Sequence, residues 1–406
     1  MIRLLWLFVF CVAARAQSLP ALIDDALRAN REILAAQKRY EAARQRPSQE
    51  RSLPDPTVSL GYTSVGRPYP VAGIGSAVTA NAGVMVSQEM PFPGKRQLRG
   101  AIAEKEASAE FDEYRAVRLN VVERLTEAYH TLHHAMVAIE YTKRYQELLE
   151  NIMRITEARY SVGRAAQQDI FKAQTQYSIF ATQLLRYQQE RTAKTIAINA
   201  LLNRPQNTPV EVPEDLPVGE LTVPLEELVA RARTSPVMVR EQNLVQRGEL
   251  ALNLAQKNRL PDYTLAGGYF NQGSMPPMWQ FRVDIRIPAY ARGKQQAELT
   301  ERVYQASEAR RNYEAADVSI EARLRESYTL AETARKLVDL YSKSVVPEAQ
   351  LALESSMTSY ETGSLDFLPV FSNFMNLVEY QLMYHEEIMQ FHIAVARLEE
   401  LSGGEL

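Results

Sequence analysis

Cysteine, long apolar runs and excess positive charge are scarce in this sequence, and each scarcity excludes a class of protein. The chain of 406 residues has a single cysteine, Cys11. Because Cys11 falls within a predicted export signal, we expect the exported chain to have no disulfide and no thiol chemistry. The net charge of -3 argues against a nucleic-acid-binding protein, because such proteins carry a strongly basic surface.

The first residues have the parts of a cleavable export signal. Arg3 supplies the positive start, a short apolar run follows, and Ala14-Arg15-Ala16 is a small-x-small cleavage site. We therefore expect residues 1–16 to be a signal peptide and the mature chain to begin at Gln17. Lipidation is not expected, because large residues precede Cys11 where a lipid-anchored start needs small ones.

Beyond the signal, no apolar run reaches the roughly 18 residues of a transmembrane helix. Residues 279–287 instead alternate without a break between apolar and polar side chains, which indicates a strand with two unlike faces. Its length suits a tilted strand that crosses a bilayer. A half-buried strand of a soluble sandwich is the alternative. On the membrane interpretation the lipid-facing residues are Trp279, Phe281, Val283, Ile285 and Ile287, and the lumen-facing residues are Gln280, Arg282, Asp284 and Arg286.

Three landmarks occur twice in the same order, which indicates an internal repeat. Chance is a poor explanation for three landmarks in the same order, so the chain is expected to contain one unit twice. The matched pairs are Leu53-Pro54-Asp55 with Leu260-Pro261-Asp262, Pro91 and Gly94-Lys95 with Pro288 and Gly293-Lys294, and Tyr160 to Gly163 with Tyr360 to Gly363.

Each copy is predicted to run as helix, two strands, long helix, turn and helix. The first copy covers 17–203, with strands at about 56–66 and 79–90. The second covers 224–406, with strands at about 262–271 and 278–288. Prolines are dense in 204–223, which is typical of a linker.

The helical segments follow from helix-forming composition between proline and glycine punctuation. In the second long helix, a kink is expected near Pro347. A short turn containing Gly273, Pro276 and Pro277 is expected between the last two strands. The predicted helices are Ser18–Pro47, Gly94–Arg159 and Gln167–Asn203 in the first copy, and Pro224–Leu260, Arg292–Tyr360 and Asp366–Leu401 in the second.

Four strands per chain cannot enclose a barrel, because barrel diameter grows with strand number. Closure therefore needs several chains, and cyclic homo-oligomers are the usual solution. Three chains would supply twelve strands, an even number as bacterial barrels prefer. The predicted fold class is an α+β membrane protein in which this barrel continues as an α-helical tunnel.

The repeated landmarks, the export signal and the mid-chain Leu201 to Pro205 segment together resemble the outer-membrane efflux protein family, which is TolC-like. The resemblance covers nearly all of the mature chain and rests on the order and spacing of the motifs. Residues 91–96, Pro-Phe-Pro-Gly-Lys-Arg, are similar to the heavy-metal efflux branch of that family. The short C-terminal tail beyond Leu401 departs from the family pattern.

This resemblance implies a homotrimer in outer-membrane lipid, reaching into the periplasm of a Gram-negative-type cell. It further implies an exit duct that works with a periplasmic adaptor (membrane fusion) protein and an inner-membrane transporter of the RND type. The duct would pass small toxic solutes, heavy-metal cations among them, and needs no cofactor. An exported coiled-coil scaffold or adhesin without a pore, or a duct for type I protein secretion, remain as alternatives.

The two hairpin tips are the candidate periplasmic aperture, because three-fold symmetry would repeat each side chain as a ring. A carboxylate ring in a narrow pore attracts cations, and arginines there could join neighbouring hairpins. The alternative is that these residues have no role in a pore: the glycines permit the turns, and the charged side chains are simply solvated. The tip residues are Arg159, Tyr160, Gly163, Arg164, Asp169, Tyr360, Gly363 and Asp366.

No catalytic group is apparent, so an enzyme is not expected. Neither Gly-Lys pair has the upstream glycine of a phosphate-binding loop. His130, His133 and His134 share a helix face at a spacing that could hold a transition metal, but a polar helix face is the more common role of such a group. We therefore expect the protein to bind no metal at these histidines.

Overall fold

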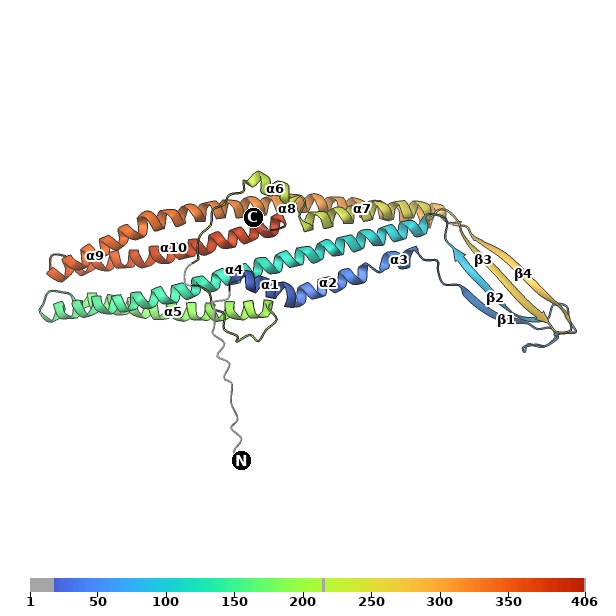
Figure 1. The fold of residues 1–406 in the computed structure, drawn as a ribbon, viewed down its shortest axis with the longest axis horizontal. Helices are drawn as coiled ribbons and strands as arrows, with labels where there is room; N and C mark the ends of the chain where they lie inside the picture. Colours follow the sequence, from blue (N-terminus) through green and yellow to red (C-terminus); the bar gives the residue numbers. More distant parts are fainter. Residues whose placement is uncertain (1–17, 214–215, 405–406) are drawn as a thin grey trace, which may run out of the picture. The chain divides into compact units, whose positions relative to one another are not determined.

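The computed structural model describes residues 18–213 and 216–404, so the expected signal peptide and Cys11 lie outside the described residues. Within that part of the chain, helices dominate and four strands form one sheet (Figure 1). None of the described helices combines the length with the apolarity that crossing a membrane requires. The elements are α1 (Leu19–Ala29), α2 (Arg31–Ala43), α3 (Arg46–Arg51), β1 (Thr57–Thr63), β2 (Asn81–Met90), α4 (Lys95–Ser161), α5 (Gln167–Leu201), α6 (Leu225–Ala232), α7 (Pro236–Lys257), β3 (Asp262–Gln272), β4 (Met275–Arg286), η1 (Ala291–Gln295), α8 (Gln296–Leu340), η2 (Tyr341–Val345), α9 (Val346–Thr362) and α10 (Phe367–Ser402).

The chain divides into two compact units, and each unit contains parts of both sequence copies. The first unit comprises residues 18–35, 115–235 and 319–404, and the second comprises 36–114 and 236–318. The sheet lies in the second unit and both helical hairpin tips lie in the first. Elements of one copy therefore fold against elements of the other rather than into two separate halves.

The expectation of a single helix from Ser18 to Pro47 is wrong, because the structure breaks it into α1, α2 and α3. Asn30 makes the first break. Its side-chain Oδ1 accepts hydrogen bonds from the backbone N–H groups of Glu32 and Ile33, at 2.9 and 3.1 Å, and so caps α2. Its Nδ2 donates to the carbonyl of Leu201, 2.9 Å away. A contact 171 residues distant in sequence thus fixes the break.

The expected helix from Pro224 to Leu260 is also divided, into α6 and α7. Pro236 is the first residue of α7, and proline disfavours the helical conformation in the residue before it. The described residues of the preceding proline-rich segment, 204–223, form no helix or strand.

The long helices agree closely with expectation. α4 runs for 67 residues from Lys95 to Ser161 without interruption. Its counterpart in the second copy consists of α8, the π-helical turn η2 and α9. The turn η2 ends two residues before Pro347, which cannot donate the backbone hydrogen bond of a regular helix. The interruption expected near this proline therefore takes the form of a π-helical turn.

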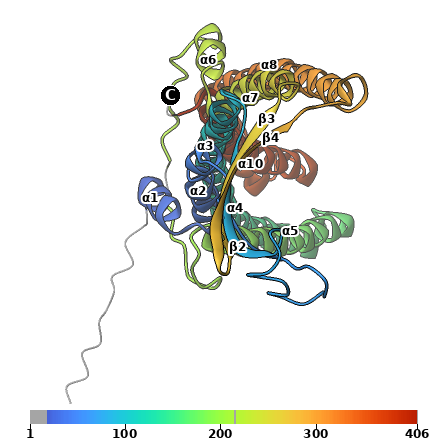
Figure 2. The ribbon, with the colours of Figure 1, turned by 90° about the vertical axis from the view of Figure 1, so that its right-hand side faces the viewer.

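The four strands form one antiparallel sheet in the order β1-β2-β3-β4. The central pair, β2 with β3, joins the first sequence copy to the second, with Ala82 opposite Asn271 and Met90 opposite Tyr263. Seen from its end in Figure 2, the sheet is curved and twisted rather than flat.

The expected turn at Pro276 and Pro277 is wrong, because both prolines lie inside β4. They lie beside the register shift between Phe270 and Gln272, where neither proline has a ladder partner on β3, and proline is tolerated at such irregular positions. The tight turn is instead made at Gly273, whose φ is 73°.

A buried apolar cluster joins the two helical hairpins in the first unit. Phe374 lies at its centre, with edge-to-face ring contacts to Tyr145 of α4 and Phe180 of α5. Ile152 and Leu149 add aliphatic side chains from α4, and both are fully buried. This packing holds the hairpin α4–α5 against the hairpin α9–α10.

Candidate functional site: a two-faced sheet and two hairpin tips

One face of the sheet is apolar and open. Period-two alternation places every second side chain of each strand on this face, and the cross-strand register aligns them, with Tyr269 opposite Trp279 and Leu265 opposite Val283. Their exposed fractions range from 37% at Val84 to 83% at Phe281. Soluble monomers rarely expose so continuous an apolar surface. The residues of this face are Val58, Leu60, Tyr62, Val84, Val86, Leu265, Tyr269, Trp279, Phe281, Val283 and Ile285.

Aromatic rings lie towards the ends of the apolar face. Tyr62 is the penultimate residue of β1, and the rings of Tyr269 and Trp279 meet edge to face at 5.1 Å beside the β3–β4 turn. Tyr263 lies at the opposite end of β3, beside Ile285. Aromatic rings at both ends of an apolar band suit the two interfaces of a membrane. Ile287, the last residue predicted to face lipid, follows the end of β4 and is 71% exposed.

The opposite face is polar and carries ion pairs. On β4, the Nε of Arg282 lies 3.0 Å from Oδ2 of Asp284. A guanidinium nitrogen of Arg286 lies 3.0 Å from Oε1 of Glu89 on β2. Gln280 is on the same face by its register position opposite Gly268. Glu89 was missed in the sequence, although its alternation with Met90 at the end of β2 was the available signal.

The sheet has two edge strands, and each of them pairs with one neighbouring strand of the described chain. Within the described chain, β1 pairs only with β2, and β4 pairs only with β3. An edge strand leaves a row of N–H and C=O groups without ladder partners. In an apolar solvent those groups must be satisfied by another strand.

The two hairpin tips share one backbone motif. At the first tip, the N–H of Gly163 donates to the carbonyl of Tyr160, and the N–H of Arg164 donates to that of Arg159. At the second, Gly363 donates to Tyr360, and Ser364 donates to Ser359. Both glycines have positive φ, 73° and 84°, as this type of helix end requires. The turn role of the two glycines therefore follows from geometry.

Arg159 connects the two tips. Its guanidinium donates to the backbone carbonyl of Tyr360 and lies over the Tyr360 ring, 4.3 Å from the ring centre. Tyr360 is buried, and its hydroxyl donates to the side-chain oxygen of Thr156, 3.0 Å away. Arg159 and Tyr360 thus hold the hairpins of one chain together, whereas Tyr160 is 44% exposed and Arg164 is also exposed.

The two tip carboxylates differ in what they contact. Asp169 is half-buried near the start of α5, and its Oδ2 accepts a hydrogen bond from the backbone N–H of Ala166 at 3.3 Å. Asp366 is the exposed N-cap residue of α10 and makes no capping hydrogen bond through its side chain. Asp366 is the more available of the two for an aqueous opening.

The histidines of α4 contact a histidine that the sequence did not connect with them. The ring of His130 stacks on that of His392 from α10, with centres 4.2 Å apart and planes 4° from parallel. Parallel rings direct their nitrogens within their own planes, so the two share no common ligand position. Across the described residues, no group of three or more His, Cys, Asp or Glu side chains is arranged to hold a metal ion.

Burial keeps these rings uncharged. It lowers the pKa of His130 to about 2, with His392 and His133 adding smaller repulsions. It lowers the pKa of His392 to about 4, again with repulsion from His133. The pKa of His134 is also lowered, first by burial, although Glu190 opposes the shift. The rings of His130, His134 and His392 are thus neutral parts of the core.

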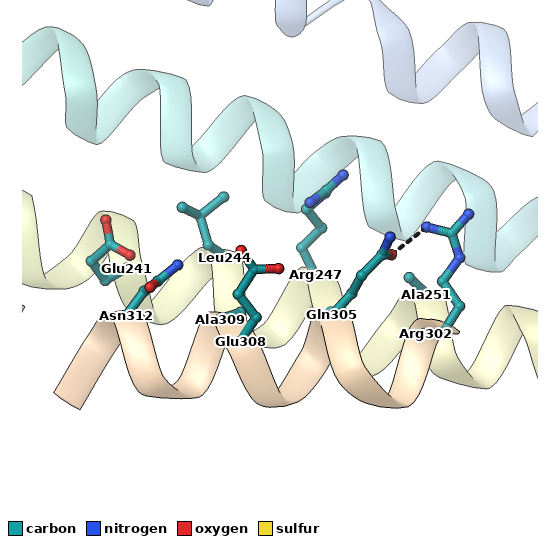
Figure 3. Close-up of a pocket in the computed structure, with 10 residues that line it drawn as sticks. Glu241, Leu244, Arg247, Ala251, Arg302, Gln305, Glu308, Ala309 and Asn312 are labelled. Carbon is teal, nitrogen blue, oxygen red and sulfur yellow. Dashed lines mark hydrogen bonds between the residues drawn. The ribbon is translucent and has the colours of Figure 1, made fainter. Parts of the chain in front are cut away.

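A groove between α7 and α8 is lined by four charged side chains, three of which are already engaged (Figure 3). Glu241 accepts hydrogen bonds from Arg240, Arg247 donates to Glu106 at 2.7 Å, and Arg302 donates to Gln305 at 2.7 Å. Both signs of charge line the groove, so it favours neither cations nor anions. It is better explained as a furrow between packed helices than as a ligand site.

Comparison with known proteins gives one family and several solved folds. The outer membrane efflux protein family matches residues 22–204. No curated protein matches the chain at the level of sequence.

Among solved structures, the outer membrane protein VceC from Vibrio cholerae has 19% identity and a TM-score of 0.81, over 95% of this chain and 96% of VceC. The CmeC outer membrane channel of Campylobacter jejuni has 16% identity and a TM-score of 0.81, over 95% of this chain and 85% of CmeC. CusC, which forms a transmembrane channel, has 16% identity and a TM-score of 0.79, over 95% and 92%. At these identities the likeness establishes the fold.

Proposed function

We propose that the chain belongs to the outer membrane efflux protein family, whose model matches residues 22–204, and that it is the exit duct of a tripartite efflux pump. Members of this family are transport proteins of the outer membrane and not enzymes. The protein lies in the outer membrane of a Gram-negative-type cell and extends into the periplasm. Three copies form the duct, with a twelve-stranded barrel in lipid and an α-helical tunnel beneath it.

The apolar face of the sheet is the observation that carries this proposal. An exposed surface from Val84 at 37% to Phe281 at 83% is stable only against lipid or another apolar layer. A sheet in lipid must also close, because its edges would otherwise hold unsatisfied backbone groups. Four strands are too few to close alone, and three copies supply an even number of strands. A scaffold or adhesin without a pore has no need of such a face.

The polar face would then line a water-filled lumen through Gln280, Arg282, Asp284 and Arg286, with Glu89 beside them. The tips would form the periplasmic aperture. In the trimer each exposed Asp366 would be one of three carboxylates around the opening, a pattern that favours cations.

The partners are a periplasmic adaptor and an inner-membrane transporter of the RND type, which supply the energy. Transport through the duct itself is passive. The adaptor and transporter select the cargo, so small toxic solutes, heavy-metal cations and a secreted protein all remain compatible with the same duct.

Single-cysteine labelling along β4 tests the proposal directly. Cys11 is the sole native cysteine and lies in the expected signal peptide, so each introduced thiol would be the only one in the exported chain. We expect Arg282→Cys and Asp284→Cys to react with a membrane-impermeant maleimide, since they face water. Phe281→Cys and Val283→Cys should react with a lipid-soluble maleimide only.

The control is a cysteine in place of Ser161, at an exposed helix end, which should react with both reagents. Sedimentation of the purified protein in detergent should give three chains per particle. Equal labelling of all four strand positions by the impermeant reagent, or a water-soluble monomer, would refute the duct.

A further inference from the structure

A buried ion pair ties the end of β2 to the start of β3. The Nζ of Lys95 lies 2.8 Å from Oδ1 of Asp262 and also donates to the carbonyl of Leu260 at 2.9 Å. The same carboxylate oxygen accepts the backbone N–H of Phe92 at 2.7 Å. The Lys95 side chain is only 3% exposed. This anchor therefore fixes the place where two adjacent strands leave the sheet and the helices begin.

The internal repeat supplies the same two groups a second time. Asp262 stands in Leu-Pro-Asp at 260–262, which repeats Leu-Pro-Asp at 53–55. Lys95 stands in Gly-Lys at 94–95, which recurs at 293–294. Asp55 lies two residues before β1, and Asp262 is the first residue of β3. Lys95 follows the end of β2, and Lys294 follows the end of β4. The second carboxylate and the second ammonium thus occupy equivalent places in the chain.

Within one chain the second pair cannot form. Asp55 and Lys294 are both exposed, and the described structure shows no hydrogen bond or ion pair for either. The reason is the strand order, since β1 and β4 are the two opposite edges of the sheet. The contact that Lys95 makes across β2 and β3 has its counterpart only across β4 and the β1 of another copy.

We propose that Lys294 of one copy binds Asp55 of the next copy, where β4 of the first pairs with β1 of the second. This inference rests on the trimer proposed above and names a contact that joins its subunits. Three such pairs, alternating with the three internal Lys95–Asp262 pairs, would anchor the whole junction between barrel and tunnel.

The strand register supports the assignment independently. Thr57 pairs with Ser87 and Thr264 pairs with Asp284, so Asp284 in the second copy corresponds to Ser87 in the first. Ser87 pairs with Ala266 across the central strands. Ala266 corresponds to Ser59, which places Asp284 opposite Ser59 of the next copy.

The transferred register keeps both faces continuous. In this register, the residues next to Asp284 and Ser59 are also paired, so Val283 lies opposite Leu60 of the next copy. Both side chains belong to the apolar face. A register displaced by a single residue would place apolar side chains opposite polar ones. The repeat therefore predicts a subunit contact whose two faces match those within the chain.

The two copies differ just before the second lysine. Gly94 has a φ of 93° directly before Lys95, whereas Gly293 lies in the π-helical turn η1. Two more residues separate Pro288 from Gly293 than separate Pro91 from Gly94. The same turn carries a second cation, Arg292. Arg292 is therefore the matched control for Lys294.

Carbodiimide coupling of the full-length protein in detergent tests the pair. The reagent activates a carboxylate, and an amine in contact displaces it to form an amide while the reagent leaves as a urea. We expect a covalent link between Asp55 and Lys294 of different chains, identified by mass spectrometry of the digested protein. Lys294→Arg keeps the charge but cannot form this amide, so the interchain band should be lost. Arg292→Gln should retain the band.

Charge exchange gives a second readout. Asp55→Lys and Lys294→Asp should each lower the temperature at which the trimer dissociates, and the two together should restore much of the loss. A trimer that gives no link between residues 55 and 294, or keeps the band in Lys294→Arg, overturns this pair and leaves the duct standing. A monomer in sedimentation overturns the proposed trimer and this contact with it.

Discussion

At the scale of single residues, the stacked histidines show how burial sets chemistry. His130 and His392 are polar in sequence, yet their burial against each other lowers both pKa values far below the range of an exposed imidazole. A buried neutral imidazole costs much less free energy than a buried imidazolium, because protonation would place a cation in the core. The folded chain therefore binds fewer protons than the unfolded chain in mild acid.

This difference predicts a loss of stability in acid. Below pH of about 6.5 the unfolded histidine is protonated, while folded His130 stays neutral down to about 2. The free energy of unfolding should fall by about 1.4 kcal/mol per pH unit for each such residue. His130→Phe keeps a stacked ring without a titrating group, so its urea midpoint should fall less between pH 7 and pH 5. Circular dichroism gives the midpoints, and equal losses in both proteins would contradict the prediction.

At the scale of elements, the central strands leave no space for a side chain at one glycine. A Cβ on Gly83 would lie 2.2 Å from the backbone oxygen of Tyr269 and 2.5 Å from the ring of Phe270 on β3. A Cβ on Gly267 would meet only the Phe281 ring, at an ordinary 3.6 Å. The joint between the two sequence copies thus depends on the lack of a side chain at Gly83.

Alanine at these two positions should therefore have unequal effects. Gly83→Ala should displace β2 from β3 and reduce the yield of heat-resistant folded protein, because the blocking atom is backbone. Gly267→Ala is the matched control in the facing strand and should fold like the parent protein. Gel mobility of unheated and heated samples measures the folded fraction. Similar yields for the two variants would show that the strands can part without cost.

The glycines at the hairpin tips differ from Gly83, because a side chain at either of them would meet no neighbouring atom. A Cβ atom on Gly163 or Gly363 would have no neighbouring atom within 4 Å. Both glycines are required by their positive φ and not by close packing. The tips are therefore shaped by backbone conformation, and their neighbours are free to present charge to solvent.

At the scale of the whole molecule, the proposed trimer would turn single tip residues into rings. Asp366 is exposed without a capping bond, whereas Asp169 is engaged by the N–H of Ala166. We expect Asp366→Ala combined with Asp169→Ala to raise the conductance of the trimer in planar bilayers and to lower its cation selectivity. Of the single variants, Asp366→Ala should have the larger effect.

Glu348→Gln provides the comparison for this measurement, because it removes an exposed carboxylate from α9 away from the tip. Its conductance should equal that of the parent protein. Unchanged conductance and selectivity in the double variant would exclude these carboxylates from the aperture.

Much of the architecture was readable from local pattern. The unbroken alternation at 279–287 predicted a two-faced strand. The absence of proline, and of any glycine beyond Gly94 and Gly100, predicted the long helix α4. The repeated landmarks predicted that the same elements occur twice. The alternation and the helix-forming composition each lie within one stretch of chain, and the repeat is found by comparing two stretches, so the sequence alone was sufficient for all three.

The tertiary structure decided what depends on distant partners. Asn30 breaks a helix that its composition would allow to continue, because its amide reaches the carbonyl of Leu201. Pro276 and Pro277 enter a strand because they lie beside a register shift in the pairing of β3 with β4, where neither needs a ladder hydrogen bond. Lys95 acquires its role only when Asp262 of the second copy is brought beside it. Periodicity is a local property of a chain, whereas pairing and burial are set by residues far apart in it, and only the folded chain brings those together.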